Sequence, residues 1–234
     1  MNTVFKIYRF DPESGRNPRY QYFEIDVTKG QTVLDALIEI KAHKDGSLVF
    51  RRSCRSGICG SCAMQINGLN KLACETQVED LKSKTVTIDP LPGFKPIKDL
   101  AVDMEPFYDK LRAVLPYLIN PDSPPTDKER IQSPEEFKMI ELATSCILCG
   151  GCTSSCPSFW ADKAYLGPAA LVKAYRYVFD TRDRGYSDRS GVVNNKHGLW
   201  RCHTIMNCND ACPKHIFPTE GISLLKRKVV EEKY

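Results

Sequence analysis

The chain has 234 residues and a formal net charge of +4, with 42% of its residues apolar and 26% charged. This is an ordinary globular composition, enough for one large domain or two modest ones. No run approaches the roughly 18 apolar residues of a membrane helix, and no dense basic stripe with interleaved aromatics indicates nucleic-acid binding. No charged-then-apolar leader precedes the first strand pattern, so we expect no export signal and membrane association only through a partner.

The first third of the chain is predicted to be rich in strands. Apolar-rich runs with partial alternation predict strands at residues 4–10 and 20–27, and further short strands are expected at residues 63–66 and 85–88. The turn residues of Asp11–Gly15 favour a hairpin between the first two runs, and Asn67-Gly68 ends the third. Thr32 is expected to cap a helix with Asp35 in its first turn and apolar positions at helical spacing. A hairpin, a covering helix and later strands match a small β-grasp ferredoxin domain.

The rest of the chain is predicted to be helical. Three prolines between residues 90 and 96 are hard to place in a sheet or helix, so this segment is expected to close the first domain. Helices are expected over residues 104–118, 133–142 and 168–179 and from Thr219 onward. Ser133 and Glu136 predict a capping box, with Pro134 at the first helical position. The expected fold class is α+β, with a β-rich domain over residues 1–103 and an α-helical domain over residues 104–234.

The first group of cysteines has the spacing of a plant-type [2Fe–2S] centre. The predicted ligands are Cys54, Cys59, Cys62 and Cys74. Gly57 and Gly60 lie in this loop and let the backbone curl so that amide groups can point at sulfur. Arg51, Arg52 and Arg55 place positive charge beside an anionic cluster and are expected to raise its potential. The alternative is that these arginines are surface charges that contact a partner protein.

Two later stretches share one cysteine frame, and the second stretch lacks one thiol. The first has Cys146, Cys149, Cys152 and Cys156, and the second has Cys202, Ile205, Cys208 and Cys212 at the same spacing. In the two-cluster ferredoxin run, the fourth cysteine of each frame binds the other cluster. This rule assigns to a [4Fe–4S] cluster the residues Cys146, Cys149, Cys152 and Cys212. It leaves for a [3Fe–4S] cluster the residues Cys156, Cys202 and Cys208. Ile205 supplies no ligand there, and the alternative is that His203 or water completes a labile four-iron centre.

The cysteine count favours clusters over other uses of thiols. Eleven cysteines are an odd number, which is poor material for a disulfide framework, and zinc sites usually pair two short clips to give four ligands. Clusters with four, four and three thiolates use every cysteine, so the chain is predicted to carry electrons. No G-x-G-x-x-G or P-loop occurs, so a flavin or nicotinamide is expected on another chain.

The order of these motifs resembles the iron–sulfur subunits of succinate dehydrogenase and fumarate reductase. The matching strings are residues 51–60, 146–149, 156–160 and 201–208. The resemblance implies a flavoprotein partner whose covalent FAD oxidises succinate to fumarate. It also implies that electrons pass singly through [2Fe–2S], [4Fe–4S] and [3Fe–4S] clusters to a quinone, as in respiratory complex II and the tricarboxylic acid cycle. The same architecture in reverse, a quinol:fumarate reductase, is the alternative.

The resemblance also implies a quinone pocket beside the [3Fe–4S] cluster. The positions that match it are Pro157, Ser158, Trp160, His203 and Ile205. Ala161 stands where many ubiquinone-reducing members have a second Trp, which leaves the quinone type open. Trp160 read by itself is equally consistent with a core aromatic, and His203 with a structural histidine.

Partners and location follow from the same resemblance. It implies one or two membrane anchor subunits, with the presence of haem b left open, and a peripheral position on the cytoplasmic face of the bacterial inner membrane. A free-standing ferredoxin shuttle and a structural zinc protein remain alternative hypotheses. Subunits of glycolate or heterodisulfide-type oxidoreductases usually carry Cys-Cys-Gly motifs, and none occurs here.

Overall fold

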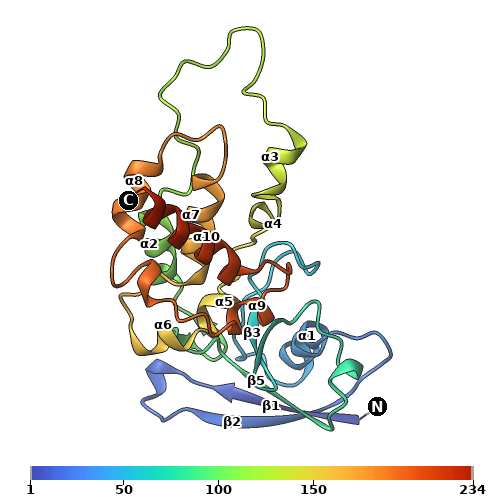
Figure 1. Ribbon diagram of the computed structural model, residues 1–234. Helices are drawn as coiled ribbons and strands as arrows, with labels where there is room; N and C mark the ends of the chain where they lie inside the picture. The colour runs from blue at the N-terminus through green and yellow to red at the C-terminus, as the bar shows by residue number, and fades with distance from the viewer. Residues whose placement is uncertain (1, 233–234) are drawn as a thin grey trace. The chain divides into compact units, whose positions relative to one another are not determined.

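The computed structural model describes residues 2–232 and divides into two compact units (Figure 1). The first unit comprises the chain up to Met104 together with Ile147–Ser155, and the second comprises Glu105–Cys146 and the chain from Cys156 onward. The main segment of the first unit ends within a residue of the predicted boundary at 103/104. Residues 147–155, which carry two of the predicted cluster ligands, are grouped with the first unit.

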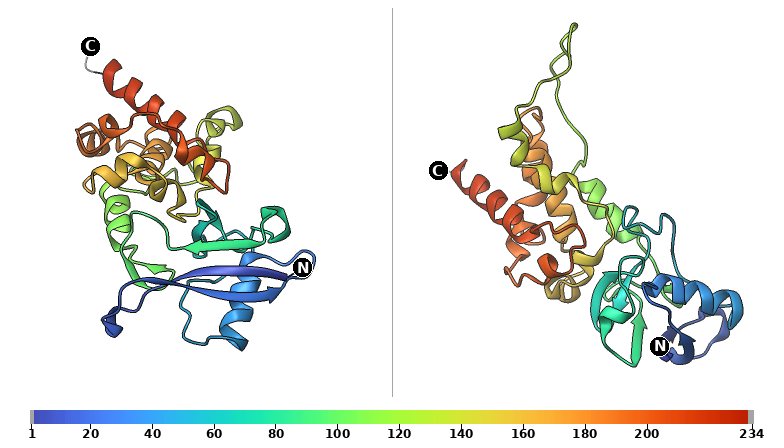
Figure 2. Two further views of the ribbon diagram at one scale, coloured as in Figure 1. Left: turned by 90° about the horizontal axis from the view of Figure 1, so that it is seen from below. Right: turned by 90° about the vertical axis from the view of Figure 1, so that its right-hand side faces the viewer.

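A five-stranded mixed sheet forms the centre of the first unit. Its strands are β1 (Asn2–Arg9), β2 (Arg19–Asp26), β3 (Ala63–Ile66), β4 (Leu69–Leu72) and β5 (Thr85–Asp89). They lie in the order β2-β1-β5-β3-β4, with β1 and β5 parallel. Helix α1 (Val33–His43) packs against the sheet (Figure 2). Side chains such as Phe5, Ile7 and Leu37 are fully buried between them. The four predicted strands are confirmed, and β4 is an addition to them.

Local interactions explain where α1 begins. The backbone N–H of Asp35 donates to the Thr32 hydroxyl over 3.2 Å, and the Thr32 N–H donates to the Asp35 carboxylate over 3.0 Å. This is the predicted capping box, which satisfies two N–H groups that the first turn leaves without helical partners.

The β1–β2 hairpin is confirmed, but two of its aromatic residues face outward. Tyr20 and Tyr22 are 41% and 61% exposed, and β2 contributes Phe23 and Ile25 to the core instead. The Tyr20 hydroxyl donates to an Asp89 oxygen on β5 over 2.5 Å. This hydrogen bond raises the pKa of Tyr20 to about 12, because a nearby carboxylate favours the protonated phenol.

Side-chain hydrogen bonds attach residues 147–155 to the first unit. This segment contains α5 (Gly151–Ser154). The Asn70 amide donates to the Gly151 carbonyl over 3.0 Å, and the Ser154 hydroxyl donates to the Pro92 carbonyl over 2.7 Å. The proline-rich stretch leads into a small two-stranded sheet of β6 (Pro96–Lys98) and β7 (Ala101–Val102).

The second unit is helical. Its helices are α2 (Glu105–Ala113), α3 (Pro134–Lys138), α4 (Glu141–Thr144), α6 (Pro157–Ala161), α7 (Pro168–Val178), α8 (Tyr186–Val193), α9 (Asn207–Asp210) and α10 (Pro218–Glu231). Helices α7 and α10 pack side by side (Figures 1 and 2) and bury Leu171, Ile222 and Leu225. Over residues 2–232, no helix combines the length and apolar character that crossing a bilayer requires.

Two predicted helices are shorter than expected. Helix α2 ends at Ala113 rather than at residue 118, because Leu115 takes a φ of +51° immediately before Pro116. The predicted helix over residues 133–142 has the expected capping box at Ser133 but divides into α3 and α4. The Met139 carbonyl, at the break, accepts a hydrogen bond from the Tyr175 hydroxyl of α7.

Helix α10 begins one residue before the predicted start. The first helical residue is Pro218, and Thr219 follows it inside the helix. The Thr219 hydroxyl exchanges hydrogen bonds with the Asn209 side chain in α9, at 2.8 and 3.1 Å. Thr219 therefore lies one residue inside α10 and ties it to α9.

A buried arginine joins separate segments of the second unit. Arg189 in α8 is fully buried and pairs with Asp183 at 2.7 Å. Its guanidinium also donates to the carbonyls of Leu115 and Tyr117, at 3.0 and 2.6 Å. The planar fork suits this role, because it satisfies a carboxylate and two carbonyls at once.

Candidate metal centres

The first candidate centre lies in the loop that carries Cys54 and Cys59. Backbone N–H groups of Ser56, Ile58 and Cys59 donate to the Cys54 Sγ over 3.4, 3.3 and 3.3 Å. These hydrogen bonds, first of all that from Ser56, lower the pKa of the Cys54 thiol to about 6. The Cys54 N–H in turn donates to the Cys59 Sγ over 3.5 Å. A thiolate stabilised in this way is ready to bind iron.

A hairpin brings together the other two thiols of this centre. Cys62 precedes β3 and Cys74 follows β4, and the turn between the strands has Asn67 and Gly68 at φ values of +48° and +81°. Two positive φ values in succession fit a type I′ turn, which returns the chain tightly. Burial is the main cause that raises the pKa of Cys62 to about 12. The Gly57 N–H donates to the Cys74 Sγ over 3.3 Å and links the hairpin to the first loop.

The four thiols form an exposed pair and a buried pair. Cys54 and Cys59 lie at the surface, whereas Cys62 and Cys74 are buried. Their spacing, the N–H groups aimed at sulfur and the lowered pKa of Cys54 all fit a [2Fe–2S] cluster. A cluster bound here would have one ligand pair within reach of another protein.

Gly60 allows a second cysteine segment to pack against this loop. A Cβ at Gly60 would lie 2.8 Å from the Cα and Cβ of Cys149 and 2.9 Å from the Ile147 carbonyl oxygen. Its φ of +71° also favours glycine. Ligands predicted for two different clusters are therefore neighbours within the first unit.

The second candidate centre lies among three cysteines of the second unit. Cys156 precedes α6, Cys202 follows a short 3-10 helix, and Cys208 lies in α9. All three line one cavity of about 290 Å³, part of which is open to solvent. Burial, and then the proximity of Cys156 and Cys202, raises the pKa of the Cys208 thiol to about 12. Three neighbouring thiolates are stable only beside positive charge, which an iron core supplies, so the donor set fits an iron–sulfur cluster.

Ile205 and Tyr165 complete the wall of this cavity. Ile205 lines it from the vacant position of the second frame and is 49% exposed. Tyr165 is fully buried, and burial followed by the three thiols raises the pKa of its phenol. Sequence reasoning missed Tyr165, because a single tyrosine outside any cysteine frame carries no pattern that points to a cluster.

The remaining four cysteines are divided between the units. Cys146 and Cys212 come from different frames, yet both pack against the same apolar cluster of Ala143, Val172 and Ile216 in the second unit. Cys149 and Cys152 belong to the first unit.

Comparison with family models gives two matches in the expected order. The model of a 2Fe-2S iron-sulfur cluster binding domain matches residues 4–109, and that of a 4Fe-4S dicluster domain matches residues 141–216. The chain is 46% identical over 229 residues to the succinate dehydrogenase iron-sulfur subunit of Paracoccus denitrificans, covering 97% of this chain and 88% of the relative. The chain belongs to the family of succinate dehydrogenase iron–sulfur subunits. The mitochondrial succinate dehydrogenase [ubiquinone] iron-sulfur subunit of Candida glabrata is 44% identical, with 97% and 90% covered.

Solved structures resemble the iron–sulfur subunit over its whole length. A chain of the Mycobacterium smegmatis Sdh1 complex in the apo form matches with a TM-score of 0.86 and 25% identity, covering 100% of this chain and 97% of that one. A hypothetical protein from Helicobacter pylori matches with a TM-score of 0.58 and 17% identity, covering 96% and 39%, and shares the fold alone.

Family membership settles the class of protein. The chain is the electron-transfer subunit of a succinate dehydrogenase, complex II, with an N-terminal β-grasp [2Fe–2S] ferredoxin domain and an α-helical ferredoxin-like domain. The predicted α+β fold class and family are confirmed, and the shuttle and zinc hypotheses are set aside. Over residues 2–232, no three His, Cys, Asp or Glu side chains converge on a point suited to a single metal ion.

Four of the five residues predicted to line a quinone pocket gather at the three-cysteine cavity of the iron–sulfur subunit. They are Pro157, Ser158, His203 and Ile205. Trp160 is not among the residues that line it, and 46% of its surface is exposed. The cavity therefore joins the predicted cluster ligands to most of the predicted quinone contacts.

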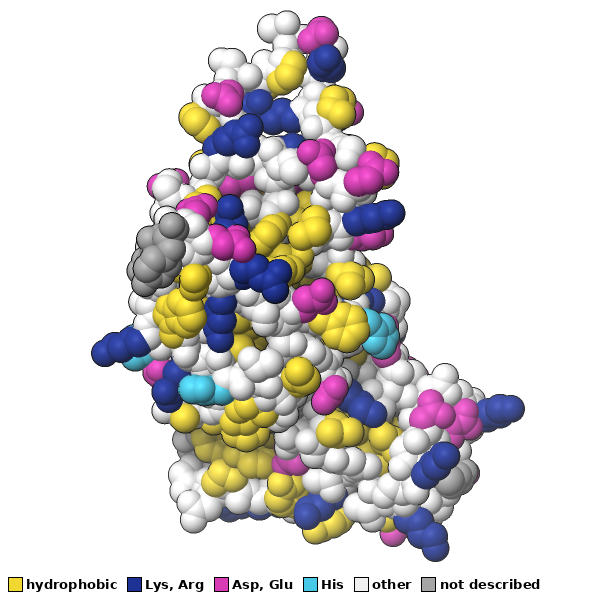
Figure 3. Space-filling model, viewed as in Figure 1, with side chains coloured by type: hydrophobic (Ala, Val, Ile, Leu, Met, Phe, Trp, Pro, Cys, Tyr) yellow, Lys and Arg dark blue, Asp and Glu magenta, His cyan; other side chains and the backbone are white. Residues whose placement is uncertain are grey.

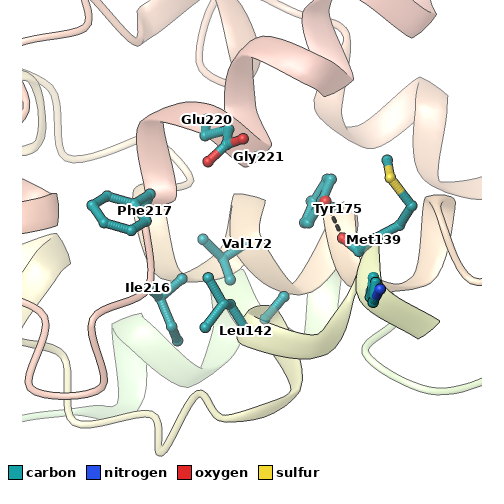
Figure 4. Close-up of a pocket in the computed structure, with 10 residues that line it drawn as sticks. Met139, Leu142, Val172, Tyr175, Ile216, Phe217, Glu220 and Gly221 are labelled. Carbon is teal, nitrogen blue, oxygen red and sulfur yellow. Dashed lines mark hydrogen bonds between the residues drawn. The ribbon is translucent and has the colours of Figure 1, made fainter. Parts of the chain in front are cut away.

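The iron–sulfur subunit also has an apolar groove that no sequence pattern indicated. Hydrophobic side chains are exposed on the second unit (Figure 3), and Figure 4 shows Met139, Leu142, Ile216 and Phe217 around a groove of about 480 Å³ that is open to solvent. Met139, Leu142 and Phe217 are 46%, 50% and 52% exposed. Within residues 2–232, no residue lines both this groove and the three-cysteine cavity.

Proposed function

We propose that this subunit conducts electrons from the FAD of a flavoprotein through [2Fe–2S], [4Fe–4S] and [3Fe–4S] clusters to a quinone. The observation that carries the proposal is that Cys156, Cys202 and Cys208 line one cavity, with Ile205 beside them. Two distant segments thus supply three thiols, and an aliphatic side chain stands where the frame calls for a fourth. Such a donor set favours three irons, since a fourth iron would have no thiolate.

The proposed ligand sets follow the cysteine frames. The [2Fe–2S] ligands are Cys54, Cys59, Cys62 and Cys74. The [4Fe–4S] ligands are Cys146, Cys149, Cys152 and Cys212. The first set is supported by the N–H···S hydrogen bonds at Cys54 and Cys74. The second is supported by the cross-ligation rule and by the packing of Cys146 and Cys212 on one apolar cluster. When bound, the clusters supply one-electron redox chemistry, and the protein orients them, excludes water and sets their potentials.

Electrons are proposed to enter at the exposed pair Cys54 and Cys59. This pair lies at the surface of the first unit, and Arg52 and Arg55 beside it are exposed as well. A cationic rim can steer a partner with complementary charge and favours the reduced, more negative cluster. The flavoprotein subunit is the proposed partner on this side.

Electrons are proposed to leave at the three-cysteine cavity. Pro157, Ser158, His203 and Ile205 line it, and His203 and Ile205 are exposed. An exposed imidazole beside an aliphatic side chain can donate a hydrogen bond to a quinone carbonyl while the ring packs on apolar surface. We keep Trp160 in the proposed contact set because it follows the cavity segment in α6 and presents an exposed indole.

We further propose that the subunit is peripheral, on the cytoplasmic face of a bacterial inner membrane. Its proposed partners are the flavoprotein and one or two membrane anchor subunits, with or without haem b. Support comes from the likeness to the Paracoccus denitrificans subunit and to a chain of the Mycobacterium smegmatis complex. Copurification of the tagged chain from solubilised membranes, with the associated chains identified by mass spectrometry, tests this assembly.

Low-temperature EPR of the purified complex tests the cluster assignment. The expected result is a three-iron signal in the oxidised protein, with [2Fe–2S] and [4Fe–4S] signals appearing on stepwise reduction, and with matching iron and sulfide contents. Reduction of the clusters by succinate, seen as loss of the three-iron signal and appearance of the signals of the reduced clusters and reversed by added quinone, would support their place on the electron path. Zinc in place of iron, or an oxidised complex without the three-iron signal, would contradict the proposal.

A further inference from the structure

The Tyr165 side chain lines the three-cysteine cavity, and its hydroxyl group makes no well-formed hydrogen bond to another protein group. Its side chain is fully buried, and it lines the cavity together with Cys156, Cys202 and Cys208. Among residues 2–232, no group has the distance and angles of a well-formed hydrogen bond to the Tyr165 hydroxyl, but the Cys202 thiol interacts with it and, after burial, contributes to the raised pKa of the phenol. The Tyr165 hydroxyl is thus one of few buried side-chain polar atoms, among the described residues, that lack a well-formed hydrogen bond.

A buried hydroxyl without a partner is unfavourable. Leaving such a group unsatisfied costs about 1–3 kcal/mol, and buried tyrosines usually find a hydrogen-bond partner. A phenylalanine would fill the same space without this cost. The hydroxyl is therefore expected to bond to something that the cavity holds in the working protein.

The segment that carries Tyr165 is held firmly in place. The Asp162 carboxylate accepts a hydrogen bond from the Ala164 N–H over 2.9 Å and lies 2.7 Å from the His197 Nδ1. The Leu166 N–H donates to the His197 carbonyl over 2.8 Å. These contacts anchor the chain on both sides of Tyr165 and fix the position of its backbone beside the cavity.

We propose that the Tyr165 hydroxyl donates a hydrogen bond to a sulfur of the three-iron cluster, either a cysteine thiolate or a sulfide. This proposal rests on the proposed function, since it requires that Cys156, Cys202 and Cys208 hold that cluster. Reduction adds an electron to the cluster and makes its sulfurs more negative. The hydrogen bond is therefore stronger in the reduced state and raises the reduction potential of the cluster.

The effect is large enough to measure. Hydrogen bonds to charged groups contribute about 1.5–3 kcal/mol, of which only the difference between the two redox states acts on the potential. We expect Tyr165→Phe to lower the ratio of reduced to oxidised three-iron cluster about tenfold at a fixed ambient potential. For a one-electron couple, this corresponds to a midpoint lower by about 59 mV.

The experiment is an EPR-monitored redox titration of the assembled complex. Tyr165→Phe is compared with the wild type and with Tyr175→Phe, which removes the hydroxyl of another tyrosine in the same unit. The Tyr175 hydroxyl donates to the Met139 carbonyl, and Tyr175 does not line the three-cysteine cavity. Only Tyr165→Phe should shift the three-iron midpoint, while its signal amplitude stays at the wild-type level.

A second measurement detects the hydrogen bond directly. Proton ENDOR of the oxidised three-iron cluster should show a coupling that disappears in D₂O and in Tyr165→Phe but persists in Tyr175→Phe. A normal three-iron signal whose midpoint and exchangeable coupling are unchanged in Tyr165→Phe would overturn the role of Tyr165 alone. Absence of the three-iron signal from the wild-type complex would overturn this proposal together with the proposed function.

Discussion

Gly60 offers a direct test of the packing between the [2Fe–2S] loop and the segment that carries Cys149. Gly60→Ala introduces a Cβ 2.8 Å from the Cα and Cβ of Cys149, at a φ of +71°. The left-handed conformation costs an alanine about 1–2 kcal/mol. Forcing an extra carbon into a packed site typically costs a further 1–3 kcal/mol, because the contacts here are mostly backbone atoms that cannot rotate away.

Gly68→Ala is the matched control for this experiment. Gly68 has a φ of +81°, but a Cβ there would have no atom within 4 Å, so this variant carries the conformational cost alone. We expect Gly60→Ala to strain the closed loop by about 1.4 kcal/mol more than Gly68→Ala does. Because this strain is released when the loop opens, the variant should lose its cluster roughly tenfold faster. The assay is the decay of the [2Fe–2S] EPR signal during timed incubation of the complex at fixed temperature. Equal decay in Gly60→Ala and Gly68→Ala would refute the close packing of the loop on Cys149.

Three further predictions concern other parts of the chain. Ile205→Cys should add a fourth iron and abolish the three-iron EPR signal, and persistence of that signal after maturation with ample iron would show that the vacant position lies elsewhere. Arg189→Met should destabilise the second unit by about 3–5 kcal/mol, because it leaves Asp183 buried without its cation. The control Arg112→Met removes one partner of an exposed ion pair and should cost at most about 1 kcal/mol. Urea unfolding followed by circular dichroism compares the stabilities of the two variants. Tyr20 should ionise near pH 12 rather than 10, so the stabilisation from its hydrogen bond is complete below pH 10 and lost as the pH rises through about 12; an ultraviolet titration against Tyr20→Phe measures this step.

Local chemistry explains which helix starts could be predicted. Thr32 with Asp35 and Ser133 with Glu136 form the expected capping boxes, because each box needs only atoms within four consecutive residues. Thr219 appeared equally suitable as a helix start. Its hydroxyl instead bonds to Asn209, which lies in another helix and leaves no sign in the local pattern.

Tertiary contacts explain the errors in element length. The expected helix over residues 133–142 is interrupted where the Met139 carbonyl accepts a hydrogen bond from Tyr175. Strand β4 was not predicted, although it completes the hairpin that returns Cys74 toward Cys62. Its residues Leu69–Leu72 include no β-branched or aromatic residue that would indicate a strand, and pairing with β3 decides their conformation.

The cysteine spacings by themselves predicted the classes of centre and indicated the family, because the ligands of an iron–sulfur cluster must follow one another at intervals that a short loop can span. They also identified Ile205 as the residue at the vacant position. Only the tertiary structure decided that residues 147–155 belong to the first unit, and that Tyr165 is buried in the cavity of Cys156, Cys202 and Cys208. These features depend on contacts between segments distant in the chain, and neither spacing nor periodicity records which distant atoms will meet.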